Sequence, residues 1–370
     1  MSRRLSSKAM VALLIASGAA VAGCGSDDSS VFAPAPQAQL FEFIMLPNFA
    51  ANTVSVRGIN TETGQTAHLS TQPTGTNPRA VRTHPSRNLF YVANQNSNNI
   101  SGFIITEGGG TNNTPGSPYA GPTGATNILF HPSGAFAYVA GDTQIRAYTV
   151  GADGSLTPIA GGTLALLQNA EFDGGFSSQG AFLHLPLNNS IQTFSVNTST
   201  GVLTATTNNA VAAGTLRDLS IHPSGTLVLA TVRVAGANND QVLPFTVSAA
   251  GVLTAQATNN LGFDVGFGDA ARNGQFYVGN DSLAQIHGFN VNAATGALTA
   301  VAGSPFAAVG GGLFPVLDPT NSLLYSVSNV GNTLAGMRRL ADGTLQGAAG
   351  TPANDSMTNP GAFDYFQFVR

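Results

Sequence analysis

Apolar and polar residues alternate along most of the chain in short runs. The runs are rich in Val, Ile, Phe, Tyr and Thr, and Gly, Pro, Asn and Asp separate them. Alternation with a period of two, broken by turn residues, is typical of short antiparallel strands. About four runs occur in every stretch of roughly 47 residues, and no helical periodicity follows residue 24.

The runs belong to a unit that is repeated along the chain. Three segments begin with the same turn, which is His-Pro-Ser, and weaker copies lie between and after them. The equivalent positions are His84, His131, Ser177, His222, Ala270 and Asp318. Successive positions are 47, 46, 45, 48 and 48 residues apart. Four strands in such a period predict the blade of a β-propeller.

Glycines in the turn before the fourth run give a second, independent count. They are Gly64, Gly108, Gly154, Gly201, Gly251, Gly296 and Gly343. There are therefore seven turns but six complete His-Pro-type units. The segment after Pro360 matches a first strand, and residues 43–64 match the strands that should follow it. We predict an all-β, seven-bladed β-propeller over residues 40–370, in which N-terminal and C-terminal strands close the ring within one blade.

The first 24 residues have the layout of a secretory signal. A basic start precedes an apolar stretch from Met10 to Ala22, and Val-Ala-Gly then precedes Cys24. This end resembles the bacterial lipobox, in which the cysteine is acylated and becomes the new N-terminus. We expect residues 1–23 to be a lipoprotein signal peptide and residues 24–39 a flexible tether. The alternative is an ordinary cleaved signal with a chance cysteine.

The expected anchor places the protein at the cell envelope. Acyl chains on Cys24 would attach it to the membrane, and Gly25 after the cysteine resembles outer-membrane sorting. The periplasmic and the surface side remain open, as do the general and the twin-arginine export routes, because Arg3 and Arg4 lack the usual apolar pair after them.

Composition removes several functional classes. Charged residues make up 9% of the chain, against about 25% in an average soluble protein. Lys8 and Cys24 are the sole lysine and cysteine, so a mature domain has no catalytic lysine, Walker-type nucleotide site, disulfide or cysteine metal site. Residues 24–370 carry 11 arginines and 18 acidic residues, a net charge of −7. We therefore expect no nucleic-acid partner, no cofactor and no metal.

The repeated histidines are the first candidates for chemistry. His84, His131 and His222 occupy one repeat position, so each lies in a different blade and they cannot gather around a metal ion. We expect them to close the turn between the first and second strands through side-chain hydrogen bonds.

The strings HPSG, AYVAG, ADGSLT and GSPF, together with the seven-fold count, resemble the seven-bladed lactonase propellers, the family of the propeller-type 6-phosphogluconolactonase. The resemblance covers nearly the whole chain after the tether. It implies a channel lined by the first strand of each blade, with ligands bound at a channel mouth. The position that opens each first strand is occupied, in blade order, by Arg79, Thr126, Phe172, Arg217, Val265, Leu313 and Gly361.

Charged residues are concentrated at this predicted mouth. Arg79 and Arg217 face it, and Glu171, Asp218 and Asp264 are their neighbours in the ring. The planar fork of arginine suits a carboxylate or phosphate. The alternative is that these acids pair with the arginines as structural salt bridges.

Two functional classes remain. In lactone-acting propellers the mouth presents a histidine and two arginines. By that resemblance Arg217 matches the first arginine, whereas Phe172 and Leu313 occupy the other two positions. An enzyme would hold a lactone carbonyl with Arg217 and activate water with Glu171 or Asp218.

The incomplete mouth favours a monomeric binding module in the cell envelope. Such a module would bind an unknown protein, a glycan or a small anionic ligand, with Arg79, Arg217 and Asp264 as contacts. The Asn-rich segment 94–99 is a further recognition surface.

Overall fold

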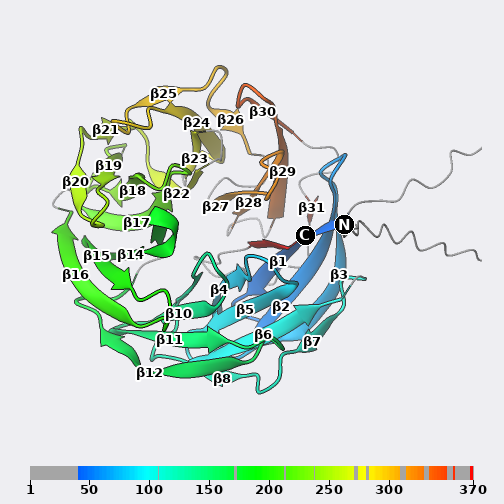
Figure 1. Cartoon of the computed structure of the whole chain (residues 1–370). Helices are drawn as coiled ribbons and strands as arrows, with labels where there is room; N and C mark the ends of the chain where they lie inside the picture. The colour runs from blue at the N-terminus through cyan, green and yellow to red at the C-terminus, as the bar shows by residue number, and fades with distance from the viewer. Residues whose placement is uncertain are drawn as a thin grey trace, which may run out of the picture. The chain divides into compact units, whose positions relative to one another are not determined.

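Seven antiparallel sheets form a ring in the computed structural model (Figure 1). The structure describes residues 41–106, 108–170, 173–211, 214–236, 238–270, 274–280, 283–308, 314–328, 333–347, 353–354 and 367–369. Residues 1–40 lie outside this set, so the signal peptide, the tether and Cys24 stay predictions. The seven-bladed β-propeller predicted from the repeats is confirmed.

We number the blades by the order of their first strands. Blade 1 contains β4 (Pro78–Thr83), β5 (Leu89–Asn94), β6 (Asn99–Ile105), β7 (Thr111–Asn113) and β8 (Tyr119–Ala120). Blade 2 contains β9 (Asn127–Phe130), β10 (Phe136–Ala140), β11 (Gln144–Val150) and β12 (Leu156–Ala165). Blade 3 contains β13 (Gly175–Ser177), β14 (Phe182–Leu187), β15 (Ser190–Val196) and β16 (Leu203–Ala210), with a 3₁₀ turn η1 (Ser178–Gly180) after β13.

The other four blades repeat this order. Blade 4 contains β17 (Thr215–Ile221), β18 (Leu227–Arg233), β19 (Gln241–Val247), β20 (Leu253–Ala255) and β21 (Asn259–Asn260). Blade 5 contains β22 (Val265–Ala270), β23 (Gln275–Asn280), β24 (Gln285–Val291), β25 (Leu298–Ala300) and β26 (Phe306–Ala307). Blade 6 contains β27 (Phe314–Leu317), β28 (Leu323–Ser328), β29 (Thr333–Arg339), β30 (Leu345–Gly347) and β31 (Ala353–Asn354). Blade 7 contains β1 (Phe41–Asn48), β2 (Thr53–Asn60), β3 (Thr66–Pro73) and β32 (Gln367–Val369).

The position of a strand within its blade decides its burial. First strands such as β17, β22 and β27 lie towards the middle of the ring, and β12, β16 and β20 lie at its rim (Figure 1). Every described residue of β5 and β23 is buried, because a second strand is packed on both faces against neighbouring blades. Exposed and half-buried residues alternate along much of β16 instead. This difference explains why strings such as Leu-Phe-Tyr-Val are continuously apolar.

Blade 7 is assembled from both ends of the chain, as predicted. Strand β1 pairs with β32, with Ile44 opposite Phe368 and Met45 opposite Gln367. The β1–β2 hairpin of blade 7 corresponds to the β5–β6 hairpin of blade 1, and in this alignment Asn48 is equivalent to Asn94. Met45 therefore corresponds to Tyr91, whose partner is Arg82. Gln367 is therefore equivalent to Arg82. The match of Pro360 to Pro78 predicts that a residue three positions earlier in the sequence stands there, so the last strand begins later than predicted.

The glycines that the repeats placed in turns have positive φ values, except at Gly108. Gly154, Gly201 and Gly343 have φ values of 85°, 74° and 90°, a region that side chains other than glycine avoid. In blade 1 this conformation belongs to Gly109, with φ 75°, and not to Gly108. The turn there closes as it does around Gly154, because Thr106 donates its N–H to the carbonyl of Gly110 as Gly151 does to that of Ser155. In both turns the residue before the acceptor has the positive φ, which is Gly109 in blade 1.

Tyrosines in the second strands join neighbouring blades. Tyr91 and Tyr138 donate their hydroxyl hydrogens to the carbonyls of Gly154 and Gly201, at 2.6 and 2.9 Å. These glycines lie in the outer turns of the next blades. Burial raises the pKa of both tyrosines, so the hydroxyls keep the hydrogens that they donate.

The same contact closes the ring. Tyr277 of blade 5 donates to Gly343 at 2.6 Å, and Tyr325 of blade 6 donates to Gly64 of blade 7 at 2.7 Å. The last of these bonds joins residues 261 positions apart in the sequence. It supplements the pairing of β1 with β32.

The histidines have the structural role expected of them. Nδ1 of His84 accepts the N–H of Ser86 at 3.2 Å, and Nδ1 of His222 accepts that of Ser224 at the same distance. The other nitrogen of His84 donates to the carbonyl of Gly134 in blade 2, at 2.9 Å. The histidine thus also joins its own turn to the turn of the next blade.

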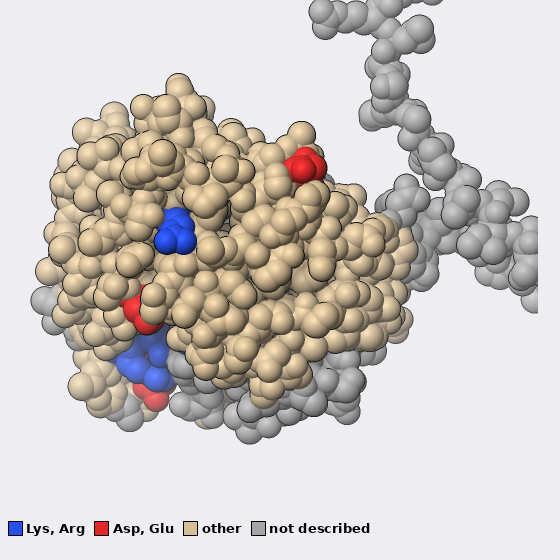
Figure 2. All heavy atoms as spheres, turned by 90° about the horizontal axis from the view of Figure 1, so that it is seen from below, with Lys and Arg blue, Asp and Glu red and all other residues tan. Residues whose placement is uncertain are grey.

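The surface of the propeller carries few charges. Figure 2 shows a few acidic and basic groups, some of them adjoining, among mostly uncharged side chains. Within the described ranges no helix has the length and apolar character needed to span a membrane.

We predict that deletion of residues 360–370 abolishes the single cooperative unfolding transition, because β1 then has an unpaired edge and the ring is open. Thermal unfolding followed by circular dichroism measures this. Deletion of residues 25–39, the predicted tether, is the matched control and should leave the midpoint unchanged. A chain without 360–370 that unfolds in one transition near the wild-type midpoint contradicts the prediction.

Tyr325→Phe should lower the free energy of unfolding by about 1–3 kcal/mol, because the carbonyl of Gly64 loses its donor in a buried place. Tyr138→Phe removes the same bond between blades 2 and 3 and should cost a similar amount. Urea unfolding curves of both variants test this. A Tyr325→Phe protein as stable as the wild type would show that the contact does not stabilise the closure.

Candidate functional site

Arg79 and Arg217 occupy the same structural position in blades 1 and 4. In blade 1 the pairing passes from Pro78–Asn94 to Ala80–Ala93, so Arg79 is the extra residue of a β-bulge. In blade 4 it passes from Leu216–Val232 to Asp218–Thr231, which makes Arg217 the extra residue there. Bulges turn a side chain away from the regular pleat. The two arginines therefore open equivalent first strands at the same end of the ring, where the sequence predicts the channel mouth.

Each arginine packs against an aromatic ring of a neighbouring blade. The guanidinium carbon of Arg79 lies 5.6 Å from the ring centre of Phe49, in the β1–β2 turn of blade 7. That of Arg217 lies 5.1 Å from the ring centre of Phe267, in β22 of blade 5. Cation–π contacts of this length restrict the guanidinium plane. The arginines are half-buried, so the stacking holds them without removing them from solvent.

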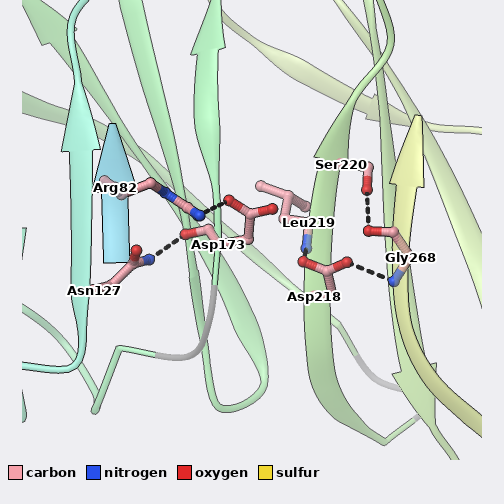
Figure 3. A network of polar contacts seen from close by, with 7 residues as sticks. All are labelled: Arg82, Asn127, Asp173, Asp218, Leu219, Ser220 and Gly268. Atoms are coloured by element: carbon pink, nitrogen blue, oxygen red, sulfur yellow. Dashed lines mark hydrogen bonds and ion pairs between the residues drawn. The ribbon is translucent and has the colours of Figure 1, made fainter. Parts of the chain in front are cut away.

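Asp218 faces away from this mouth. Its carboxylate accepts the N–H of Leu219 at 2.7 Å and the N–H of Gly268 in blade 5 at 2.8 Å (Figure 3). The residue is 1% exposed. Burial raises its pKa well above the usual range, and the negative charge of Asp173 raises it further. The described residues include no ion pair between Asp218 and Arg217.

A chain of polar contacts joins the first strands below the mouth. Arg82 of β4 pairs with Asp173, which precedes β13, across blade 2, and Asn127 of β9 donates to the carbonyl of Asp173 (Figure 3). In blade 5 Asp269 accepts the N–H of Leu317 in blade 6 at 2.9 Å. Sequence reasoning missed this network, although the repeat alignment places Arg82 and Asp218 on equivalent strands.

Asp264 lies in the connection between blades 4 and 5. Its carboxylate accepts the N–H of Asn238 at 2.8 Å, and the residue is half-buried. Glu171, Phe172, Leu313 and Gly361 lie outside the described residues. The predicted pairing of Glu171 with an arginine therefore remains a prediction.

His184 forms a buried contact that sequence reasoning did not find. Its Nε2 lies 2.7 Å from the hydroxyl of Ser177, and its Nδ1 lies 2.9 Å from the hydroxyl of Thr193. Burial lowers the pKa of His184 to about 4, so the ring is neutral at pH 7. All three side chains are fully buried, and a substrate cannot reach the serine. The Ser177–His184 contact resembles a catalytic pair only in its distance. The role of His184 is to connect three strands of blade 3.

Among the residues that the structure describes, no group of three or more His, Cys, Asp or Glu side chains is arranged to hold a metal ion.

The sequence and the fold were compared with known proteins. The family model described as Lactonase, 7-bladed beta-propeller, matches residues 39–123 and 103–262. The chain belongs to this family. No curated protein matches its sequence significantly.

Solved structures share the fold at low sequence identity. A putative 6-phosphogluconolactonase from Bacteroides fragilis is 17% identical, with a TM-score of 0.71, covering 91% of this chain and 100% of that one. The periplasmic gluconolactonase of Pseudomonas aeruginosa is 16% identical, with a TM-score of 0.69 and coverages of 90% and 99%. A protein from Lactobacillus plantarum is 15% identical, with a TM-score of 0.72 and coverages of 90% and 100%.

The adjacent residues Arg217 and Asp218 have different surroundings in this lactonase-family propeller. We predict that Asp218→Ala lowers the free energy of unfolding by about 2–4 kcal/mol, because two buried N–H groups lose their acceptor. Urea unfolding gives the measurement. An Asp218→Ala protein with unchanged stability would mean that the carboxylate has no structural role.

Proposed function

We propose that this chain is an exported, lipid-anchored binding propeller that holds a small anionic ligand at the mouth formed by Arg79 and Arg217. The observation that carries the proposal is the matched placement of these two side chains. Both are extra residues of β-bulges at the start of first strands, and both are stacked on an aromatic ring. A preorganised guanidinium loses little freedom when it binds a carboxylate or phosphate.

The surroundings of Asp218 favour binding over hydrolysis. Hydrolysis of a lactone needs a base that contacts the attacking water. Asp218 is buried and already accepts two backbone N–H groups. A ligand held at Arg217 is therefore not placed beside this carboxylate.

Lactone hydrolysis is the second candidate, and family membership favours it. A structural neighbour from Bacteroides fragilis is named a putative 6-phosphogluconolactonase, and one from Pseudomonas aeruginosa a periplasmic gluconolactonase. In this alternative Arg217 polarises the ring carbonyl, and Glu171 is the base.

Binding and turnover are measured on the same proteins. We expect 6-phosphogluconate and gluconate to bind the wild type in calorimetry. Arg217→Ala should weaken binding at least roughly tenfold, because a hydrogen bond to a charged group contributes about 1.5–3 kcal/mol. The melting temperature should change little. Arg146→Ala, on β11, is the matched control. Equal affinity of the wild type and Arg217→Ala contradicts the binding site.

Hydrolysis of δ-gluconolactone and its 6-phosphate in a pH-stat separates the two functions. The binding proposal expects no rate above the uncatalysed background. A wild-type rate that falls in both Arg217→Ala and Glu171→Gln would replace it with the lactonase.

The envelope location rests on the N-terminal sequence and on the periplasmic neighbour. We predict that Cys24→Ser moves the protein from the membrane fraction to the soluble fraction, because each buried CH₂ of an acyl chain contributes about 0.8 kcal/mol to attachment. Fractionation followed by immunoblotting measures this. Retention of Cys24→Ser in washed membranes would argue against the lipobox.

A further inference from the structure

The two arginines of the proposed binding site lie far apart around the ring. Arg79 lies near the start of β4 in blade 1, and Arg217 near the start of β17 in blade 4. Three steps from blade to blade are the greatest separation that a closed ring of seven allows. The two first strands accordingly face the middle of the ring from different sides (Figure 1).

The aromatic contacts hold the two guanidinium groups at separate blades. Arg79 is turned from blade 1 towards Phe49 of blade 7, and Arg217 from blade 4 towards Phe267 of blade 5. Blade 6 lies between these two rings. Phe267 is itself stacked on Phe314 of blade 6, with 4.1 Å between ring centres, and both rings are part of the buried core. Because a packed core resists movement, the guanidinium of Arg217 is fixed on its own side of the ring.

A single carboxylate is too small to pair with both guanidinium groups. Its two oxygens fit the planar fork of one arginine. A guanidinium has five N–H donors, so each arginine can bind one carboxylate while it keeps contacts to the protein. Occupation of both arginines therefore requires two separate anions, or one molecule with an anionic group at each end.

One molecule with two anionic ends binds more favourably than two separate anions. After the first end has bound, the second is held near its arginine at a high effective concentration. The loss of translational and rotational freedom on binding then occurs only once. A ligand that spans the ring thus uses the opposite placement of Arg79 and Arg217.

The charges at this end of the ring favour carboxylates over phosphates. One guanidinium carries a single positive charge, which balances one carboxylate. A phosphate monoester carries about −1.5 to −2 charges. The half-buried Asp264 lies in the connection between blades 4 and 5, the blades of Arg217 and Phe267, so a second negative charge on the ligand would meet repulsion there.

We propose that the ligand of this site is a linear dicarboxylate that spans the ring, with one carboxylate paired to Arg79 and the other to Arg217. This inference rests on the proposed binding function and adds the class of ligand to it.

Calorimetry on the purified protein tests this with matched pairs of acids. Glucarate and gluconate differ in one terminal carboxylate, as do the dicarboxylates from succinate to suberate and the monocarboxylates of equal length. We expect at least one dicarboxylate to bind at least roughly tenfold more tightly than its monocarboxylate, because it gains a second charged pair. One dicarboxylate should bind per chain.

Arg79→Ala should remove this advantage and lower the affinity for the dicarboxylate to that for the monocarboxylate. The affinity for the monocarboxylate should change little, because Arg217 still binds it. Arg79→Gln, which keeps a polar side chain, is a second variant and should give the same result. Arg146→Ala is the matched control and should keep the advantage. Thermal unfolding of each variant shows whether it is folded.

The dicarboxylate inference and the proposed function fail in different ways. Both are wrong if no carboxylate binds, or if Arg217→Ala binds monocarboxylates as tightly as the wild type does. The inference alone is wrong if monocarboxylates bind through Arg217 but no dicarboxylate binds more tightly, or if two dicarboxylates bind per chain. Tighter binding of 6-phosphogluconate than of glucarate would replace the second carboxylate with a phosphate and overturn the inference as stated.

Discussion

A hydrogen bond between neighbouring blades underlies the rest of this structure. A tyrosine hydroxyl on a second strand reaches the carbonyl of a glycine in the next outer turn, and in blades 1 and 2 the glycines are Gly154 and Gly201. The bond requires a left-handed glycine in the turn. It also requires space above the ring, and a Cβ on Gly102, opposite Tyr91, would lie 3.0 Å from that ring.

Blades that lack this tyrosine are joined by other means. Blade 3 has His184 at the equivalent position, and its ring bonds within the blade. Blade 4 has Leu229 there, and its contact with blade 5 includes Asp218, which accepts the N–H of Gly268. Acidic residues are thus used inside the ring as acceptors for backbone N–H groups.

The two ends of the channel differ in chemistry for a structural reason. At one end the β-bulges direct Arg79 and Arg217 onto aromatic rings. At the other end the His-Pro turns join the blades, and the replacement of histidine by Ser177 leaves an uncharged hollow.

The sequence by itself determined the seven blades, the closure by both termini and the common position of Arg79 and Arg217, because strand periodicity and turn conformation depend on residues that are near in the chain. It assigned one turn to the wrong glycine, because Gly108, Gly109 and Gly110 are consecutive and the positive φ belongs to Gly109. Only the tertiary structure decided that Phe49 and Phe267 support the arginines, that Asp218 turns towards Gly268, and that a hollow lies beside Gln179. Each of these depends on residues of different blades, about 30 to 50 positions apart, whose side-chain directions follow from how the sheets pack. A repeat pattern shows which residues occupy equivalent positions. A contact between two blades depends in addition on the side chains of both facing sheets.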